Sequence, residues 1–530
     1  MQKVPTRPLL ALIRTIALVC GAVALNLCAG HGQGAGAPAA NQPNPCSACH
    51  AYEVDGFAKT TMARSMRLGG AEPTGIVRTP LSTITISSHP GGSWQTLKSG
   101  STTTRYHVDY VIGSGAHASG YIMDLGDHLF QSPVAYYRSR GAYDLAPGYE
   151  GVTDPDFTRP IGTGCLFCHA GTFDAVAGTE NGFAKEPFSH LAIGCNRCHG
   201  PTASHLAKPD GHNIVNPALL QPAARDSVCE QCHLKGLARV LNPGKRFTDY
   251  QAGQRLEDTF TIYHDEIPKG SEGVFRVISH AEQLAVSECK RNSGDRLWCG
   301  TCHDPHNKPT EASSYFRAKC LGCHAQTVLA ASHPPKTSDC IACHMPKRGV
   351  ADGGHTAFTD HRIQRRPVDQ VAEETTSIVP WRAPSPELAA RNLGIASIET
   401  GLERRSATLI VSGYRMLTEV QAQFSQDSDM YTTMGSALLI GRQYAEAVEA
   451  FALAVRLDPT SSPKEADLGQ AYAALGDSAA AEHHLERAME LDPVNLGAAY
   501  QLIAIYNANS ETTKAEQLSQ RLSIIVQQKK

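Results

Sequence analysis

The chain has 530 residues, a formal net charge of -3 and 42% hydrophobic residues, a composition typical of a globular chain of about two to four domains. It contains no basic run of the kind that binds nucleic acid. After the N-terminal segment it also contains no apolar stretch long enough to predict a transmembrane helix.

The first segment, residues 1–37, is predicted to be a signal peptide followed by a small-residue linker. Lys3, Arg7 and Arg14 precede an apolar core at 15–27, and small residues follow it, which is the pattern of a secretory signal. Cleavage is expected between residues 29 and 37. Cys28 follows Leu27 rather than a small residue, which disfavours a lipid anchor. We therefore expect an exported protein, in the periplasm or at the cell surface.

Fourteen of the seventeen cysteines belong to seven copies of the pattern Cys-x-x-Cys-His. We number these copies motifs 1 to 7 in chain order. They are Cys46, Cys49 and His50; Cys165, Cys168 and His169; Cys195, Cys198 and His199; Cys229, Cys232 and His233; Cys299, Cys302 and His303; Cys320, Cys323 and His324; and Cys340, Cys343 and His344.

This spacing predicts covalent attachment of seven c-type haems. Two thiols one turn apart reach the two vinyl groups of one porphyrin, and the next residue brings an imidazole to the iron. Structural zinc would need cysteine pairs that converge on one metal, whereas here the number of units is odd and each ends in histidine. A disulfide framework or a thioredoxin-like pair explains the histidines no better. An exported location agrees with this prediction, because haem is added to such motifs outside the cytoplasm.

The segment 46–363 is expected to form the seven-haem cytochrome domain. It provides roughly 45 residues per haem, too few for a separate apolar core around each cofactor, so we expect the haems themselves to be the core. The predicted fold is mainly α, with short helices and extensive irregular loops. The exception is 74–113, where β-branched residues flank the turn-like Pro90-Gly91-Gly92 and predict a small β-meander.

Each iron also has a sixth ligand position. Fourteen histidines outside the motifs lie between His31 and His361, and bis-histidine ligation of all seven irons needs only seven of them.

Further motifs carry a resemblance to a known family. They are Tyr110-Val-Ile-Gly-Ser-Gly with His117, Phe130-Gln-Ser-Pro-Val-Ala-Tyr-Tyr137, His190 and His205 around motif 3, Ser279-His280-Ala-Glu-Gln, Asp304-Pro-His306 after motif 5, His333 before motif 7, and Thr359-Asp-His361-Arg-Ile. In these, residues 46–363 resemble multihaem cytochromes related to the tetrahaem cytochrome of hydroxylamine oxidation, whose larger members often carry tetratricopeptide repeats.

The resemblance implies a set of distal iron ligands. They are His117, His190, His205, His280, His306, His333 and His361. His355 competes with His361, and spacing does not exclude His89, His107, His128, His212 or His264. Met62 or Met66 is an alternative axial ligand at motif 1, although a methionine near haem more often only packs against it.

A linker is expected at 364–393, and a helical region at 394–530. Leu457-Asp458-Pro459 recurs as Leu491-Asp492-Pro493 at a spacing of 34 residues, which is the tetratricopeptide period. Two repeats are expected at 428–461 and 462–495, a weaker third at 496–528, and a degenerate one at 394–427. Such an α-solenoid presents a concave surface. We expect it to dock redox partner proteins; the alternative is that it only caps the cytochrome.

Electron transfer along a chain of haems is the expected function. The alternative is an oxidoreductase that acts on hydroxylamine or nitrite at one five-coordinate haem. In the related nitrite reductases a Cys-x-x-Cys-Lys site commonly marks the catalytic haem, and no motif here ends in lysine, so no catalytic residue is assigned. Cys289 belongs to no motif. Haem propionates make the loaded protein more acidic, which favours basic patches on its partners.

Overall fold

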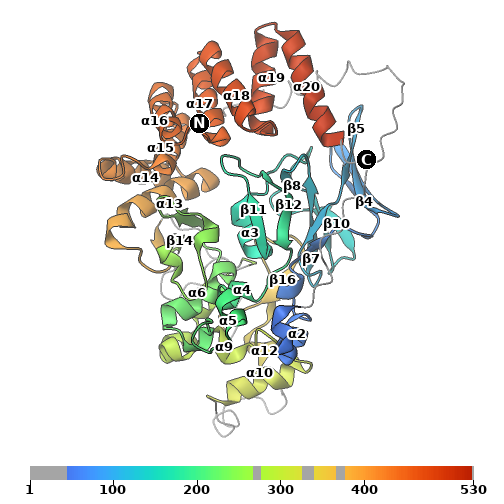
Figure 1. The fold of residues 1–530 in the computed structure, drawn as a ribbon, viewed down its shortest axis with the longest axis vertical. Coiled ribbons are helices and arrows are strands. Elements are labelled where there is room, and N and C mark those ends of the chain that lie inside the picture. The colour runs from blue at the N-terminus through green and yellow to red at the C-terminus, as the bar shows by residue number, and fades with distance from the viewer. Residues whose placement is uncertain (1–43, 267–275, 278, 325–338, 366–376, 528–530) are drawn as a thin grey trace.

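The computed structural model describes residues 44–266, 276–277, 279–324, 339–365 and 377–527 (Figure 1). The predicted signal peptide, Cys28 and His333 lie outside the described residues. Within them, no helix is long and apolar enough to cross a membrane.

The predicted β-meander is confirmed as a four-stranded antiparallel sheet. Its strands are β2 (Gly75–Arg78), β3 (Ser82–His89), β4 (Gly92–Ser99) and β5 (Thr102–His107), paired in chain order. Ile84 and Ile86 of β3 are buried while residues between them face outward, which is the alternation expected of a half-buried strand. His89 pairs with Gly92, so Pro90 and Gly91 form the tight turn, and Gly91 has the positive φ of 110° that suits glycine.

A second, larger sheet was not expected. Its path is β1 (Met66–Leu68), β6 (Tyr110–Ile112), β7 (Ala118–Asp124), β9 (Val134–Tyr137) and β10 (Ala142–Leu145), and β8 (Leu129–Gln131) also pairs with β7. All pairs are antiparallel. The prediction of a mainly α cytochrome region is therefore wrong for its first third, because these strands are short and broken by glycines and turns, which hides their alternation in the sequence.

The motif-bearing region is built from short helices and small sheets. The helices are η2 (Pro45–Ala48), α2 (Ala51–Phe57), η3 (Met62–Arg64), α3 (Thr163–His169), α4 (Asn196–His199), α5 (Ala203–Ala207), η4 (Pro217–Leu219), α6 (Pro222–His233), η5 (Phe247–Asp249), η6 (Leu256–Asp258), α7 (His280–Val286), α8 (Glu288–Ser293), η7 (Gly294–Arg296), α9 (Cys299–Cys302), α10 (Ala312–Leu321) and α12 (Cys340–His344). The sheets are β11 (Thr172–Ala175) with β12 (Phe183–His190), β13 (Ala238–Leu241) with β14 (Phe260–Asp265) and β17 (Ile378–Pro380), and β15 (Lys347–Gly349) with β16 (Ala357–Thr359).

The C-terminal region is an arch of paired helices that runs from α13 at the left to α20 at the right across the top of Figure 1. After η8 (Pro386–Leu388) its helices are α13 (Ala389–Arg404), α14 (Ala407–Val420), α15 (Ser428–Ile440), α16 (Tyr444–Leu457), α17 (Ser462–Leu475), α18 (Ser478–Leu491), α19 (Leu496–Ala508) and α20 (Thr512–Gln527). Glycines allow the closest approaches: a Cβ at Gly413 would lie 2.5 Å from the carbonyl oxygen of Gly394, and one at Gly435 would meet the Phe451 ring at 2.8 Å. The small residues therefore explain why the two helices of each hairpin pack so tightly.

The solenoid and the N-terminal region share two apolar cores. One joins the meander, for example Ile84, to Leu485 and Leu502 of the solenoid. The other places Ile395 and Ile398 of α13 against Val240 of β13. The segment expected to be a linker contributes β17, which pairs with β14, so the chain passes directly from sheet to solenoid.

Protein side chains also form a core inside the expected cytochrome segment. Leu129, Leu166 and Phe183 lie in one buried cluster, and Phe167 and Phe260 lie in another that includes η5 and η6 residues. The expectation that haems alone form the core is therefore wrong for the part of the segment around β7, α3 and β14.

Candidate functional site

Motifs 1, 3, 5 and 6 share one local backbone geometry. In each, the histidine N–H donates to the carbonyl oxygen of the first cysteine, four residues earlier, at 2.8 to 2.9 Å. This hydrogen bond closes one α-helical turn. The two thiols and the imidazole of a motif are thus held on adjacent positions of a single turn, as attachment of one porphyrin requires.

Three motif histidines face a second histidine at nearly the same spacing. The ring centroids lie 6.4 Å apart for His50 and His205. The spacing is 5.9 Å for the motif 3 histidine and His306, and 6.1 Å for the motif 5 histidine and His361. Two imidazoles on opposite sides of one metal ion have centroids about 6 Å apart, because each metal–nitrogen bond is about 2 Å long and the centroid lies roughly 1 Å behind the nitrogen. The three pairs fit axial ligation of one iron each.

A fourth pair is closer and turned. His233 of motif 4 and His280 lie 5.5 Å apart with ring planes at 81°. His280 also lies 4.8 Å from His361, so the ligand pairs of motifs 4 and 5 touch. Burial, and after it the nearby His361, lowers the pKa of His280 to about 3. A neutral imidazole is the form that binds a metal.

Backbone carbonyls orient several of these rings. The Nδ1 atom of His199 lies 2.7 Å from the carbonyl oxygen of Val215, that of His344 2.8 Å from Gln364 O, and that of His361 2.9 Å from Thr359 O. His205 Nδ1 lies 2.9 Å from the side-chain oxygen of Asn213. An Nδ1–H donor to such an oxygen fixes the tautomer whose Nε2 carries the lone pair, which is how proteins orient a metal-binding histidine.

Several histidines that the sequence left open have other partners. His355 Nε2 lies 2.9 Å from Asp144 Oδ2, and His128 Nε2 lies 2.9 Å from Asp492 Oδ1. His107 Nδ1 bonds Asp109 at 3.0 Å. These contacts favour His361 over His355 as the ligand at motif 5.

His264 and the two methionines also have ordinary structural environments. His264 packs against Trp381 with ring centroids 5.5 Å apart. Met66 is 2% exposed inside an apolar cluster with Leu129 and Leu166, which favours packing over ligation; Met62 lies in η3. His89 ends β3 and His212 lies in a loop.

For the remaining predicted ligands that lie in the described part of the chain, His117 and His190, no ring contact with a motif histidine is found. His117 lies 4.5 Å from Phe358 of β16, and burial followed by Lys347 lowers its pKa. His190 ends β12 beside Gly171 and Gly194, between motifs 2 and 3. The protein atoms packed around His169 and His233 lower the pKa of each, although both residues reach the surface.

The sequence missed the residues that join the motifs. Arg197, between the cysteines of motif 3, donates to the carbonyl oxygen of Phe167 in motif 2 at 2.6 Å. Gln231, in motif 4, donates to the carbonyl oxygen of Arg197 at 3.0 Å. The two positions between the cysteines are variable in the pattern, so no sequence signal marked them.

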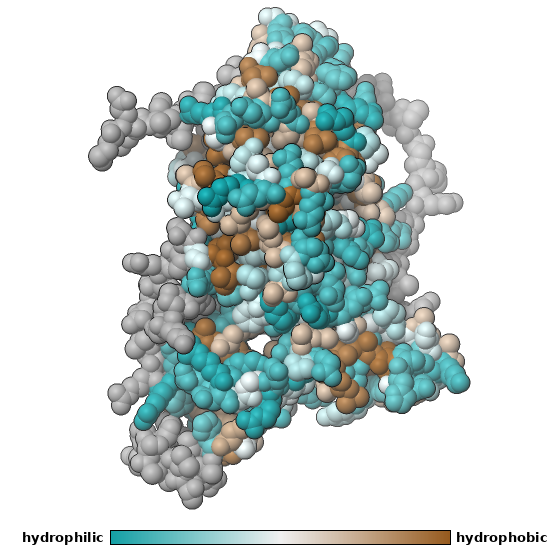
Figure 2. Space-filling model, turned by 90° about the vertical axis from the view of Figure 1, so that its left-hand side faces the viewer, coloured by the Kyte–Doolittle hydropathy of each residue, from teal (hydrophilic) through white to brown (hydrophobic). Residues whose placement is uncertain are grey.

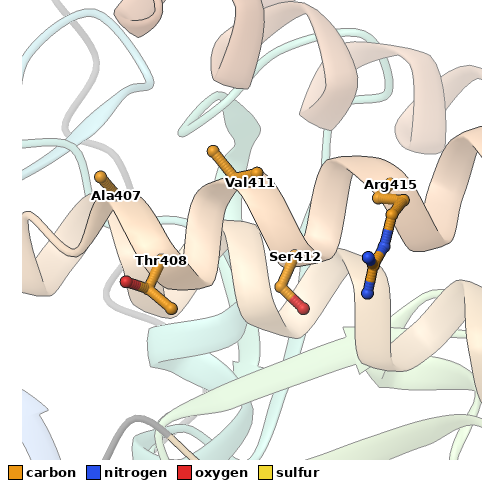
Figure 3. Close-up of a pocket in the computed structure, with 5 residues that line it drawn as sticks. All are labelled: Ala407, Thr408, Val411, Ser412 and Arg415. Carbon is orange, nitrogen blue, oxygen red and sulfur yellow. The ribbon is translucent and has the colours of Figure 1, made fainter.

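Clusters of three or more histidine, cysteine, aspartate or glutamate side chains arranged to hold a free metal ion are not found among the described residues. A hollow of about 470 Å³ lies along one face of α14 and is lined by Ala407, Thr408, Val411, Ser412 and Arg415 (Figure 3). A second, of about 190 Å³, lies between the solenoid residue Asp492 and Glu180 of the N-terminal region. The face shown in Figure 2 is mostly hydrophilic, with hydrophobic residues in several separate groups.

The comparisons with known proteins concern the solenoid. A tetratricopeptide-repeat family model matches residues 428–461 and 466–495, so the predicted repeats are confirmed there. A crystal structure of MamA is similar over 27% of this chain and 84% of its own, at 17% identity and a TM-score of 0.24. A MamA from Desulfovibrio magneticus RS-1 is similar over 27% of this chain and 88% of its own, at 17% identity and a TM-score of 0.24.

The first tetratricopeptide domain of human RPAP3 is also similar, over 23% of this chain and 97% of its own, at 22% identity and a TM-score of 0.21. No match was found among curated proteins.

Proposed function

We propose that this chain is an exported c-type cytochrome that binds seven haems covalently and transfers electrons along them, with a solenoid that docks redox partner proteins. The observation that carries the proposal is the spacing of the histidine pairs. His50, His199 and His303 each face a second imidazole at 5.9 to 6.4 Å, and each ends a Cys-x-x-Cys-His motif. Haem c supplies one-electron chemistry when bound.

The motif helices support the same proposal. α4, α9, α10 and α12 contain no buried residue. Helices this short are not stable in isolation, and protein side chains do not cover them. A covalently attached porphyrin is a large apolar surface on which such helices can pack.

Docking of partners is proposed from the tetratricopeptide repeats, which commonly present a binding surface. The shared apolar core shows that α18 to α20 also pack on the N-terminal region. Removing the solenoid would expose that core, so docking is better tested by exchanging exposed residues in the intact protein. Val411 is 69% exposed on α14; a Val411→Glu variant that slows partner-dependent reduction without changing haem content would support docking there.

The experiment that tests the proposal is electron paramagnetic resonance of the oxidised holoprotein, combined with the mass of the mature chain. Seven covalent haems, all low-spin, and no carbon monoxide adduct after reduction are expected. Fewer than seven haems would contradict the stoichiometry. One high-spin haem that binds carbon monoxide would instead favour an oxidoreductase acting on hydroxylamine or nitrite.

A matched pair of variants tests the ligand assignment. His361→Ala is expected to convert one haem from low-spin to high-spin, because His361 faces His303 at ligand spacing. His355→Ala should leave every haem low-spin, because its ring is bound to Asp144. The opposite result would exchange the two assignments.

A further inference from the structure

The motifs contact one another in a definite pattern, and this pattern extends the proposed function, on which it rests. Motifs 2, 3 and 4 interlock. The Arg197 guanidinium of motif 3 lies 4.4 Å from the centre of the Phe167 ring of motif 2 and donates to the Phe167 carbonyl. Gln231 of motif 4 donates to the Arg197 carbonyl. Motif 3 therefore contacts motifs 2 and 4 through Arg197.

Thiols of motifs 2 and 4 also meet. The Cys168 Sγ atom lies 3.4 Å from the carbonyl oxygen of Gln231, the residue before Cys232, and the Cys168 and Cys232 thiols perturb each other's pKa. On the other side of motif 4, Cys229 interacts electrostatically with Cys198 of motif 3. Motif 4 is thus adjacent to motif 2 through one cysteine and to motif 3 through the other.

Motif 1 contacts motif 3. Asn44 Nδ2, two residues before Cys46, lies 3.9 Å from the Cys195 Sγ atom, and burial followed by Cys195 raises the pKa of Cys46. The partner of His50 is His205, from the helix that follows motif 3. Among the described residues motif 1 makes its cysteine contact with motif 3 alone.

Motif 4 also contacts motif 5. The Cys229 and Cys299 thiols are neighbours that perturb each other's pKa. The distal histidines assigned to these two motifs, His280 and His361, lie 4.8 Å apart. Two independent contacts, one between thiols and one between imidazoles, therefore join motifs 4 and 5.

Motifs 5, 6 and 7 follow in order. α9 packs on α10, and α10 packs on α12. Burial, followed by Cys340 of motif 7 and Cys302 of motif 5, raises the pKa of Cys320 in motif 6. The last three motifs therefore form a line away from motif 4.

We infer that the seven attachment sites form a branched relay, in the order 1–3–4–5–6–7, with site 2 joined to the relay at site 4. Each cysteine sulfur is bonded to the edge of its own porphyrin, so sulfurs in contact bring two porphyrin edges close together. Site 4 is the junction, with three neighbours. Sites 1, 2 and 7 are the three ends.

Two of the three ends, sites 1 and 7, lie on the side of the molecule away from the solenoid, and site 2 lies nearer to the solenoid. Motifs 1 and 7, on η2–α2 and α12, lie at the bottom of Figure 1, opposite the solenoid. Phe167 of motif 2 packs in a cluster with Phe260 and Ile262 of β14, and α13 packs on the same sheet. Site 2 is therefore the end nearest the solenoid, and a partner docked on the solenoid would exchange electrons there.

The order is tested by marking one haem at a time in the full-length holoprotein. Methionine in place of a motif histidine raises the reduction potential of that haem, so a redox titration reduces it first and removes its magnetic coupling to its neighbours. In His233→Met, the signals of three other haems should change at this step; in His169→Met and in His344→Met, only one should change in each.

The outcomes separate this inference from the proposed function. A mass below that of seven haems would overturn the function, whereas seven haems with His233→Met altering two signals or fewer would overturn only the order. If a methionine variant loses its haem, iron positions from anomalous scattering of crystals of the unaltered holoprotein give the same answer. A site 2 iron closer to the irons of sites 1 or 3 than to that of site 4 would overturn the branch.

Discussion

The solenoid, at the top of Figure 1, and the motif-bearing region below it are here called the upper and lower halves of the molecule. The two halves differ in how many residues of their helices are buried. In α13 of the solenoid, nine of 16 residues are buried, and the solenoid helices pack in pairs on apolar side chains. In α9 and α12, which carry motifs 5 and 7, no residue is buried. The difference teaches that the solenoid helices are held by their own buried side chains, whereas α9 and α12 bury none of theirs.

The largest expected effect comes from preventing haem attachment. Chain produced without haem should lose amide protection in α4, α9, α10 and α12, because these helices have no apolar core of their own. The solenoid helices and the meander should keep their protection. Hydrogen exchange measured by mass spectrometry reports on both halves in one sample. An equal loss of amide protection in both halves would contradict the expected difference between them.

A smaller effect is expected where the two halves are joined by a buried charge. Arg391 of α13 is 1% exposed and bonds Asp427 at 2.7 Å. It also donates to the carbonyl oxygen of Leu241 in β13. Arg391→Met should lower the free energy of unfolding by about 3–5 kcal/mol, because it leaves the Asp427 carboxylate buried without its partner.

Arg487→Met is the matched control. Arg487 is exposed and pairs with the exposed Glu490 at 2.8 Å, so its removal should change the free energy of unfolding by less than about 0.5 kcal/mol. Thermal unfolding followed by far-ultraviolet circular dichroism measures both. Similar losses in the two variants would mean that Arg391 is not a joint between the halves.

The smallest effect depends on pH. Burial lowers the pKa of His128, but its contact with Asp492 of the solenoid outweighs this, and the net pKa is raised above 6.5. The stabilisation of the fold by the His128–Asp492 ion pair is therefore fully present below pH 6.5 and is lost as pH rises through the pKa of His128 in the folded state. His128→Gln should cost about 1–2 kcal/mol at pH 6, and the difference from the unaltered protein should shrink toward pH 9.

Asp467 of α17 should also make the fold less stable as pH rises. Burial, followed by Glu180, raises its pKa to about 7, so stability is lost as pH rises from about 4 to about 7. Asp467→Asn should flatten the pH dependence in that range. If the dependence of stability on pH is unchanged in this variant, Asp467 does not contribute to it.

Sequence patterns predicted some elements closely. The 34-residue period places the first repeat at 428–461, and the family model matches the same residues. β-branched residues around Pro90 and Gly91 predict the meander. The sheet formed by β1 and β6 to β10 was missed, because strands of three residues such as Tyr110–Ile112 are too short to show a period of two.

By itself the sequence determined what is local and repeated: the motif turns, in which five consecutive residues place two thiols and an imidazole together, and the helical hairpins of the solenoid. Only the tertiary structure decided which histidine faces which motif. It brings His50 and His205 to 6.4 Å across 155 residues of chain and turns His355 toward Asp144. The physical reason is that a pair of ligands needs two imidazole rings at a fixed spacing. For residues far apart in the sequence, that spacing is set by tertiary packing and not by the number of residues between them.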